Sequence, residues 1–328
     1  MPARPLHVDG ARLADAQGNT VVPHGVARSG TEYMCAYGWG IFDGPADQAV
    51  IDAMRSWRVD AVRVPLNEQC WLGTADVPSQ FSGPVYRQAI RDWVSLLVAN
   101  GLSVVLDLHW SAPPGTPAIG QRPMPDADNA PLFWTDVATA FRGNDAVIFE
   151  LYNEPWPDSN FDSDAAWLCW RDGGACPGVP FEAAGMQTLV NAVRATGATN
   201  VIAIAGVQYA NTLTRWLEFR PADPLGNTVA TLHVYDFDIC RDASCFDRTV
   251  APVAAVAPLI ASEIGMHVCD AAYWNMVMGW LDAHASGYLA WSWTDWGDTC
   301  TRNTLIRDYA GTPTEKGAIF RDHLAGLP

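Results

Sequence analysis

Positively charged side chains are scarce in this sequence. Lysine occurs once, as Lys316, and 20 Lys and Arg residues stand against 36 Asp and Glu residues, which gives a formal net charge of −16 over 328 residues. Such a chain lacks the basic surface through which proteins bind the phosphates of nucleic acids or anionic membranes. We therefore expect neither as a partner, whereas neutral substrates such as sugars carry no charge to be repelled.

Long apolar runs and paired metal-binding cysteines are missing as well. No stretch approaches the roughly 18 consecutive apolar residues that a membrane-spanning helix needs. The 8 cysteines form no Cys-x-x-Cys pair of the kind found in zinc and redox sites. Because cytosolic chains avoid so many cysteines, we expect four disulfides and a secreted protein, with buried free thiols as the alternative.

The sequence contains no internal repeat, low-complexity tract or linker, so we expect one domain over residues 1–328. Apolar residues make up 49% of the chain, which is enough for a large core. Near the N-terminus, two short apolar runs at 6–8 and 20–22 flank the turn-rich stretch 15–19. This pattern predicts a short N-terminal β-hairpin.

Beyond residue 23, short β-branched runs alternate with longer stretches of helical periodicity. The expected strands cover residues 25–27, 61–64, 102–108, 147–151, 201–205, 229–234, 258–260 and 288–291. The expected helices cover residues 48–57, 86–100, 131–141, 181–196, 213–219, 271–285 and 313–324. Apolar strands that each precede a helix are typical of a parallel sheet covered on both faces. The sequence therefore predicts an α/β fold, a (β/α)8 TIM barrel.

An open, doubly wound parallel sheet is the alternative to the barrel. Such sheets commonly carry a glycine-rich phosphate-binding loop after their first strand. The glycine-rich segment at 38–44 has a different glycine spacing, and bulky residues stand where the backbone must approach phosphate. This favours the barrel.

Polar side chains stand at or just beyond the carboxyl ends of the expected strands, where TIM barrels carry their active sites. They are Arg63, His109, Asn153, Glu154, His233, Tyr235, Glu263 and either Trp291 or Trp293. Each one alone is explained by ordinary structure, such as an ion pair, a hydrogen-bonded core histidine or a turn. Together they are costly polar groups gathered at one end of a barrel, so we expect an active site there.

Two glutamates of this set, Glu154 and Glu263, follow the fourth and seventh expected strands. Paired carboxyl groups hydrolyse glycosidic bonds, because one protonates the leaving oxygen while the other attacks the sugar or activates water. This chemistry predicts a raised pKa at Glu154, the acid, and a lowered pKa at Glu263. Arg63 and Tyr235 are candidates to stabilise the Glu263 anion by charge and hydrogen bonding.

The ordered set Arg63, His109, Asn153-Glu154-Pro155, His233-x-Tyr235, Glu263 and Trp291 resembles the catalytic residues of glycoside hydrolase family 5, the cellulase-type (β/α)8 barrels. The resemblance covers the chain from residue 23 almost to its end. It implies a retaining mechanism with Glu154 as acid/base and Glu263 as nucleophile. The resemblance also implies roles for the other residues. Asn153 would bind the sugar 2-hydroxyl, His233 would contact the acid/base, and Tyr235 would donate a hydrogen bond to the nucleophile. His109 and Arg63 would support the site, and Trp291 or Trp293 would form the floor of the −1 subsite.

Tryptophan is abundant, with 15 residues, and flat indole rings stack on the faces of sugars. Six of them fall in loops at the expected mouth of the barrel, namely Trp39, Trp71, Trp110, Trp134, Trp156 and Trp296, and we expect about half of the six to pack the rim. Trp39, Trp156 and Trp296 are the candidate substrate-binding residues.

Positions in the expected barrel also suggest how the cysteines pair. Loops that follow neighbouring strands lie side by side, which favours the pairs Cys35–Cys70 and Cys269–Cys300. Pairs Cys169–Cys176 and Cys240–Cys245 would close local loops.

The main functional hypothesis is an endo-β-1,4-glucanase acting on a neutral β-linked polysaccharide or oligosaccharide, as a monomer. An exo-acting β-glycosidase on short or plant-derived glycosides, and an endo-β-mannanase, remain alternatives because loops decide the substrate. A catalytically dead carbohydrate-binding barrel is the non-enzyme alternative, which the presence of both glutamates disfavours. No metal or other cofactor is expected, because carboxylate chemistry needs none and the motifs of metal and serine hydrolases are missing.

Overall fold

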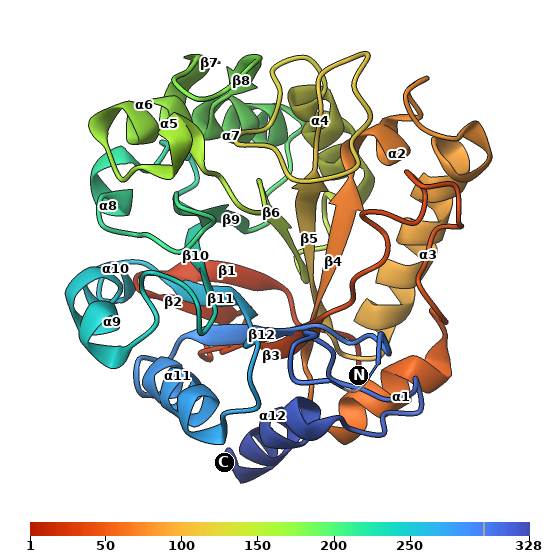
Figure 1. Ribbon diagram of the computed structural model, residues 1–328, viewed down its shortest axis with the longest axis vertical. Coiled ribbons are helices and arrows are strands. Elements are labelled where there is room, and N and C mark those ends of the chain that lie inside the picture. The colour runs from red at the N-terminus through yellow and green to blue at the C-terminus, as the bar shows by residue number, and fades with distance from the viewer. Residues whose placement is uncertain (298) are drawn as a thin grey trace.

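Residues 1–297 and 299–328 are described by the computed structural model, and they form a closed barrel of eight parallel strands (Figure 1). Around the barrel the order is β3, β4, β5, β6, β9, β10, β11 and β12, and β12 pairs with β3 to close it. The bounds are β3 His24–Ala27, β4 Ala61–Asn67, β5 Ser103–Trp110, β6 Val147–Glu150, β9 Ile202–Ala205, β10 Thr228–Val234, β11 Leu259–Ile264 and β12 Gly287–Trp291. The predicted TIM barrel is confirmed.

Helices surround the barrel on its outside (Figure 1). Their bounds are α1 Gln48–Ser56, α2 Glu68–Leu72, α3 Pro84–Ala99, α4 Ala130–Phe141, α5 Pro157–Asn160, α6 Asp164–Asp172, α7 Met186–Ala195, α8 Trp216–Phe219, α9 Ala243–Thr249, α10 Ala251–Ala254, α11 Ala271–Ala283 and α12 Glu315–Gly326. Side chains cap the first turns of several of them, as Asp47, Asp270 and Thr314 do. None of the helices in the described residues is both long enough and apolar enough to span a membrane.

The interior of the barrel changes character along each strand. Alternate residues of a strand point to the same side. At the amino ends these inward residues are apolar, and they form one buried layer of Ala61, Val105, Ile148, Ala203, Val229, Ile260 and Leu289. Two residues further along the same strands, Arg63, Asp107 and Glu150 are fully buried. The polar groups are therefore concentrated toward the carboxyl ends of the strands.

An N-terminal hairpin is present, as predicted, but its second strand is a different segment. β1, Leu6–Asp9, pairs with β2, Arg12–Asp15, whereas the sequence prediction paired residues 6–8 with 20–22. Gly10 has a φ of +62°, which allows a tight turn directly after β1. Residues 15–19 do form a second turn, in which the Asp15 carboxylate accepts from the backbone N–H of Asn19 at 2.9 Å. Leu6 and Leu13 of the hairpin pack against the apolar layer inside the barrel.

The segment between β6 and β9 differs from the predicted helix over 181–196. A short antiparallel pair, β7 Gly173–Ala175 and β8 Glu182–Ala184, precedes α7. Gly185 separates β8 from α7, and a Cβ atom at this position would lie 2.3 Å from the backbone of Asp172. The apolar periodicity continues across this boundary, so it does not reveal that the first residues pair as a strand.

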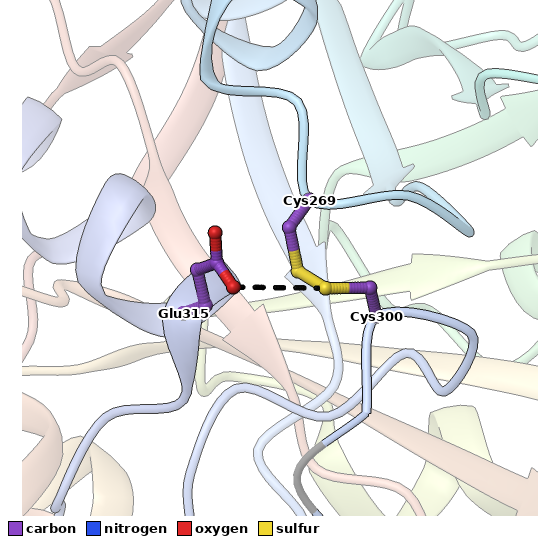
Figure 2. A group of neighbouring side chains, drawn as sticks. All are labelled: Cys269, Cys300 and Glu315. Atoms are coloured by element: carbon purple, nitrogen blue, oxygen red, sulfur yellow. Dashed lines mark hydrogen bonds between the residues drawn. A yellow bond between two sulfur atoms is a disulfide. The ribbon is translucent and has the colours of Figure 1, made fainter.

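All eight cysteines lie in the described part of the chain and form four disulfides. They join Cys35–Cys70, Cys169–Cys176, Cys240–Cys245 and Cys269–Cys300, which are the predicted pairs. Figure 2 shows the last of them beside Glu315, whose carboxylate lies 3.7 Å from Cys300 Sγ. Because both sulfur atoms are bonded to each other, this group offers no thiolate to a metal ion.

Candidate active site

A cavity of about 420 Å³ opens at the carboxyl ends of the barrel strands. Loops after β5, β6, β9, β10 and β12 contribute to its wall, together with the strand ends. The predicted site residues His109, Asn153, Glu154, Tyr235, Glu263 and Trp291 all line it. The structure thus brings together side chains that are as much as 182 residues apart, His109 and Trp291.

Glu154 and Glu263 lie close together in this cavity, and His233 contacts both. One carboxylate oxygen of each glutamate and a ring nitrogen of His233 all lie within 4.8 Å of one another. His233 Nδ1 is 2.8 Å from Glu154 Oε1 and 3.6 Å from Glu263 Oε2. Glu154 follows β6, as predicted, whereas Glu263 lies inside β11, which is longer than the expected strand. The position of Glu263 is therefore fixed by the sheet itself.

Arg63 in β4 is fully buried and contacts acidic groups from three other strands of the barrel, β5, β6 and β11. Its Nη1 donates to Glu263 Oε1 at 2.6 Å, and its Nε donates to Glu150 Oε2 at 2.6 Å. Its Nη2 donates to Asn153 Oδ1 at 2.8 Å and lies 2.9 Å from Asp107 Oδ2. Burial lowers the pKa of Arg63, but these carboxylates outweigh it and raise the pKa above its ordinary value. The site therefore holds a permanent positive charge against Glu263.

Tyr235 and His109 complete the surroundings of Glu263. The Tyr235 hydroxyl donates to Glu263 Oε2 at 2.6 Å. Burial, together with the neighbouring carboxylates, raises the pKa of Tyr235 well above its ordinary value, so this hydroxyl keeps its proton. His109 stacks on Trp291 with ring centroids 5.3 Å apart and planes 9° from parallel. Its Nδ1 lies 2.6 Å from Asp107 Oδ2, and burial lowers the pKa of His109, which favours a neutral ring.

The protonation of Glu154 depends on its partners. Burial alone raises the pKa of Glu154, but the hydrogen bond and charge of His233, with a further hydrogen bond from Gln121, hold it below its ordinary value. The sequence prediction of a raised pKa at Glu154 was therefore wrong, because it did not take into account how the expected contact with His233 acts on the pKa. Burial also lowers the pKa of His233, but the carboxylates of Glu263 and Glu154 outweigh burial and raise it. His233 and Glu154 thus hold one proton between them.

Of the two tryptophans near the end of β12, only one faces the cavity in the described residues. Trp291 lines the cavity wall. Trp293 is fully buried and packs edge-on against Trp57 of the α1 region, with ring centroids 4.7 Å apart. The prediction of Trp293 as a substrate-binding residue was wrong, because its backbone N–H bonds to the Ala27 carbonyl at the end of β3 and its ring fills the space behind the barrel wall.

The other predicted tryptophans lie in loops around the mouth. Trp39 is 65% exposed and stacks on Tyr37 with ring centroids 4.8 Å apart. Trp156 stacks on the cavity residue Tyr209 with centroids 5.5 Å apart. Trp296 is half-buried, and its indole N–H donates to a carboxylate of the loop after β3 at 2.6 Å. None of these three rings is part of the cavity wall, and Trp156 is next to it through Tyr209.

Other residues that line the cavity were not predicted from the sequence: Gln121, Tyr209, Phe237, Asp238 and Asn303. They belong to loops, where no periodicity indicates the direction of a side chain. Gln121 donates to Glu154 Oε2, and Asp238 accepts from the backbone N–H of Tyr235 at 2.8 Å. Burial raises the pKa of Asp238 to about 7. For Phe237 and Asp238 a signal was available, because they stand two and three residues after Tyr235 of the predicted His233-x-Tyr235 motif.

Glu154, His233 and Glu263 are close enough together to act as metal ligands. However, Arg63 and Tyr235 already donate to both oxygens of Glu263, and the guanidinium charge opposes the approach of a second cation. The arrangement of two carboxyl groups with an arginine on one and a histidine on the other fits proton transfer and nucleophilic attack better than metal binding.

Comparison with known proteins identifies the family. The chain matches the model described as cellulase (glycosyl hydrolase family 5) over residues 14–297, and it therefore belongs to glycosyl hydrolase family 5. This is a family of retaining glycoside hydrolases, so the resemblance predicted from the sequence is confirmed.

The relatives include enzymes named for glucan and for mannan. The chain is 24% identical over 315 residues to a mannan endo-1,4-beta-mannosidase from Salipaludibacillus agaradhaerens, which covers 93% of this chain and 87% of that protein. The structure of a beta-glucanase from Saccharophagus degradans in complex with cellotetraose has a TM-score of 0.73 at 19% identity, covering 99% of this chain and 94% of that one. A mannotriose complex of Thermomonospora fusca beta-mannanase has a TM-score of 0.69 at 19% identity, covering 99% and 98%. At these identities the two structures show the shared fold, and the protein is a β-glycanase of this family.

Proposed function

We propose that Glu154 and Glu263 cleave a β-glycosidic bond by double displacement, with Glu154 as acid/base and Glu263 as nucleophile. The observation that carries this proposal is their spacing, with carboxylate oxygens within 4.8 Å of each other. Retaining glycosidases hold the two carboxyl groups about 5–5.5 Å apart, whereas inverting enzymes need about 6.5–9.5 Å to admit a water molecule. The spacing supports direct attack on the sugar by Glu263.

In the first step, Glu263 attacks the anomeric carbon while Glu154 gives a proton to the leaving glycosidic oxygen, and a glycosyl-enzyme forms. Arg63 and Tyr235 orient the attacking carboxylate through their hydrogen bonds to its two oxygens. The proton comes from the pair of His233 and Glu154, whose atoms are 2.8 Å apart. In the second step, Glu154 takes a proton from the water that attacks the anomeric carbon and frees Glu263.

Asn153 is placed to bind the sugar in the −1 subsite. Its Oδ1 accepts from Arg63, which directs the amide nitrogen away from the barrel interior. Within the described residues this buried Nδ2 has no hydrogen-bond partner. Because a buried donor without a partner is costly, a sugar hydroxyl that accepts from Nδ2 stabilises the complex. Trp291, stacked on His109, provides the flat floor of the same subsite.

Endo action is supported by aromatic side chains in several loops around the mouth. Tyr37 and Trp39 follow β3, whereas Trp156 and Tyr209 follow β6 and β9. β3 and β9 lie on opposite sides of the closed barrel. Sugar rings that stack in more than one of these loops belong to a chain that extends beyond the sugar at the reacting carboxylates. We infer cleavage within a polysaccharide chain.

A β-1,4-glucan is the substrate that these flat rings fit best. All ring hydroxyls of β-glucose are equatorial, so C–H groups cover both faces of the sugar and stack on aromatic rings. Mannose carries an axial 2-hydroxyl on one face, which interrupts such stacking. Mannan is the second candidate, because a mannan-cleaving relative matches 93% of the chain.

The protein works outside the cell in this proposal. Four disulfides among the described residues persist in oxidising surroundings and are rare in the cytosol. A net charge of −16 does not hinder binding of a neutral polysaccharide.

The test is incubation of the purified protein with soluble β-1,4-glucan, mannan, xylan and a panel of aryl β-glycosides, with viscosity and product lengths recorded. A rapid fall in the viscosity of β-1,4-glucan, with mixed oligosaccharide products, is expected. Faster loss of mannan viscosity would replace glucan by mannan. Release of short sugars without a fall in viscosity would contradict endo action.

The role of Glu154 is tested by Glu154→Ala. We expect a loss of about 10²–10⁴-fold in kcat on the polysaccharide, because general acid catalysis contributes about that much. An aryl glycoside with an activated leaving group needs no protonation, so the formation of the glycosyl-enzyme from it is expected to lose far less. Equal losses on both substrates would contradict the acid role.

A further inference from the structure

Two loops at the mouth, the one after β11 and the one after β12, are fastened to each other beside the cavity. Figure 2 shows the disulfide between Cys269 of the first loop and Cys300 of the second, next to Glu315 at the start of α12. A second link is the hydrogen bond from the Met266 backbone N–H to Asn303 Oδ1, at 3.2 Å. The loop after β12 thereby brings Asn303 to the cavity wall in a fixed position.

The only lysine in the sequence completes this link. Lys316 is 2% exposed, and its Nζ donates to the Met266 carbonyl, to the Arg302 carbonyl at 2.7 Å and to Asn303 Oδ1 at 3.3 Å. An ammonium group has three donors, so all of them are used. The first turn of α12 is an unfavourable place for a cation, because the N-terminus of a helix carries partial positive charge. The contacts that stabilise Lys316 are therefore those with the two loops.

These contacts fix which way the Asn303 side-chain amide points. The Met266 N–H and the Lys316 ammonium can only donate, so the branch that faces them must be the oxygen. The NH₂ group occupies the other branch, and no acceptor among the described residues takes a hydrogen bond from it. We propose that Asn303 donates from Nδ2 to a hydroxyl of the sugar bound beside Trp291, and that Lys316 is the positioning residue that holds the amide in this orientation.

The neighbouring wall explains why a donor at this point selects among sugars. On this side of the cavity Trp291 offers a ring face, and the two oxygens of Glu263 already accept from Arg63 and Tyr235. A sugar that lacks the matching hydroxyl, or holds it in another direction, leaves the Asn303 donor unpaired, which a polar site penalises strongly. The contact from Asn303 rests on the proposed function in one respect, because it requires a sugar to bind in the cavity.

The experiment measures kcat and KM of Asn303→Ala and Asn303→Asp on the soluble oligosaccharide that the wild-type protein hydrolyses fastest, and on monodeoxy analogues of that sugar. Each substitution is expected to lower kcat/KM about tenfold, the size of one hydrogen bond. Asn303→Asp keeps an acceptor for Lys316, so it removes the donor without loosening the loops. One monodeoxy analogue is expected to be a poorer substrate than the parent for wild type and an equal one for Asn303→Ala. A merely structural role of Asn303 would not equalise them.

The positioning role is tested by Lys316→Met, alone and combined with Asn303→Ala. We expect Lys316→Met to lower kcat/KM, and to lower it no further once Asn303 is alanine, because the lysine acts through that amide. Arg321→Met, which removes a partly exposed cation from the same helix, is the control and is expected to leave kcat/KM unchanged.

Two outcomes overturn the inference. Losses from Lys316→Met that are equal in both backgrounds would remove its positioning role. Values of kcat/KM for both Asn303 variants within about twofold of wild type would remove the sugar contact itself. The two Asn303 variants decide this even if Lys316→Met does not fold. The choice of substrate in the proposed function is judged separately, from the wild-type protein alone.

Discussion

The two ends of the barrel use the same strands in opposite ways. At the amino end, inward side chains such as Val105 and Ile148 form an apolar layer under the hairpin. Two residues further along the same strands, Asp107 and Glu150 are fully buried against Arg63. Apolar burial stabilises the fold by about 25 cal/mol per Å², whereas desolvating an ion costs several kcal/mol.

The two ends of the barrel differ in whether charged side chains are buried there. Three acidic groups toward the carboxyl ends of the strands, Asp107, Glu150 and Glu263, are buried in contact with the guanidinium of Arg63. Some of the contacts of Arg63 also orient residues of the site. Glu263 and Asn153 both take their positions from that group. We therefore expect substitutions at the carboxyl ends of the strands, the mouth, to act mainly on catalysis. Substitutions in the apolar layer at the amino ends should act mainly on stability.

The separation is tested most strongly at the mouth by Glu263→Gln. This change removes the nucleophile and keeps the shape of the side chain, so we expect a fall of more than about 10³-fold in kcat with little change in Tm. Glu182→Gln, at an exposed glutamate of β8, is the matched control and is expected to be fully active. More than about a tenth of wild-type activity in Glu263→Gln would contradict the assignment.

Arg63→Met is expected to lower both activity and stability, because Arg63 orients Glu263 and also neutralises buried carboxylates. Without the guanidinium, Asp107, Glu150 and Glu263 lose the cation that they share, although His233 Nδ1 stays 3.6 Å from Glu263 Oε2. We expect unfolding in urea to show a loss of about 3–5 kcal/mol, and kcat to fall strongly. Adding Glu150→Gln should restore part of the stability and none of the activity. A loss below about 1 kcal/mol would show that the charge cluster does not depend on Arg63.

Ile148→Ala tests whether the apolar layer at the amino ends contributes to stability alone. Ile148 is fully buried in the apolar layer, so its truncation is expected to cost about 2–5 kcal/mol, against about 0.5–1.5 kcal/mol for Ile148→Val. At a temperature where both variants stay folded, kcat/KM is expected to match wild type. A large loss of activity in the folded Ile148→Ala protein would mean that packing in the apolar layer affects catalysis at the mouth.

The smallest expected effect is on the pH dependence of kcat/KM, which depends on titratable groups at the mouth. Activity needs the proton that His233 and Glu154 hold between them, and it is lost when that proton leaves the pair. Because the neighbouring carboxylates raise the pKa of His233, we expect the alkaline limb to lie above about pH 6.5, the ordinary value for histidine. His323→Gln, on α12, should leave the limb in place. A limb near the ordinary pKa of a glutamate, about 4.3, would contradict the shared proton.

Much of the fold could be predicted because the barrel strands are buried on both sides and occur in the sequence as continuous apolar runs. The same property hid Asp107 and Glu150, since a charged residue inside such a run does not show which way it points. The hairpin partner was missed because a two-residue turn at Gly10 competes with the longer turn that follows it. In each case a local pattern allowed two arrangements, and contacts from distant parts of the chain selected one.

In the site, the strand ends were predictable and the long loops were not. Glu154 and Glu263 were predicted because they stand at the ends of recognisable strands. Gln121 belongs to the loop between β5 and α4, whose course is fixed by distant side chains. Asn67 donates to the carbonyl of Ala118 in that loop at 2.7 Å, and no sequence period encodes such a contact. Asn303 depends in the same way on Lys316.

The most direct test of the double displacement is to trap its intermediate. An activated 2-deoxy-2-fluoro glycoside of the hydrolysed sugar reacts in the first step and resists the second, so the sugar stays bound to the nucleophile. Mass spectrometry of the digested protein is expected to find one sugar, attached to the peptide that contains Glu263. A sugar on Glu154 or on any other residue would contradict the proposed roles, as would products released with inverted anomeric configuration.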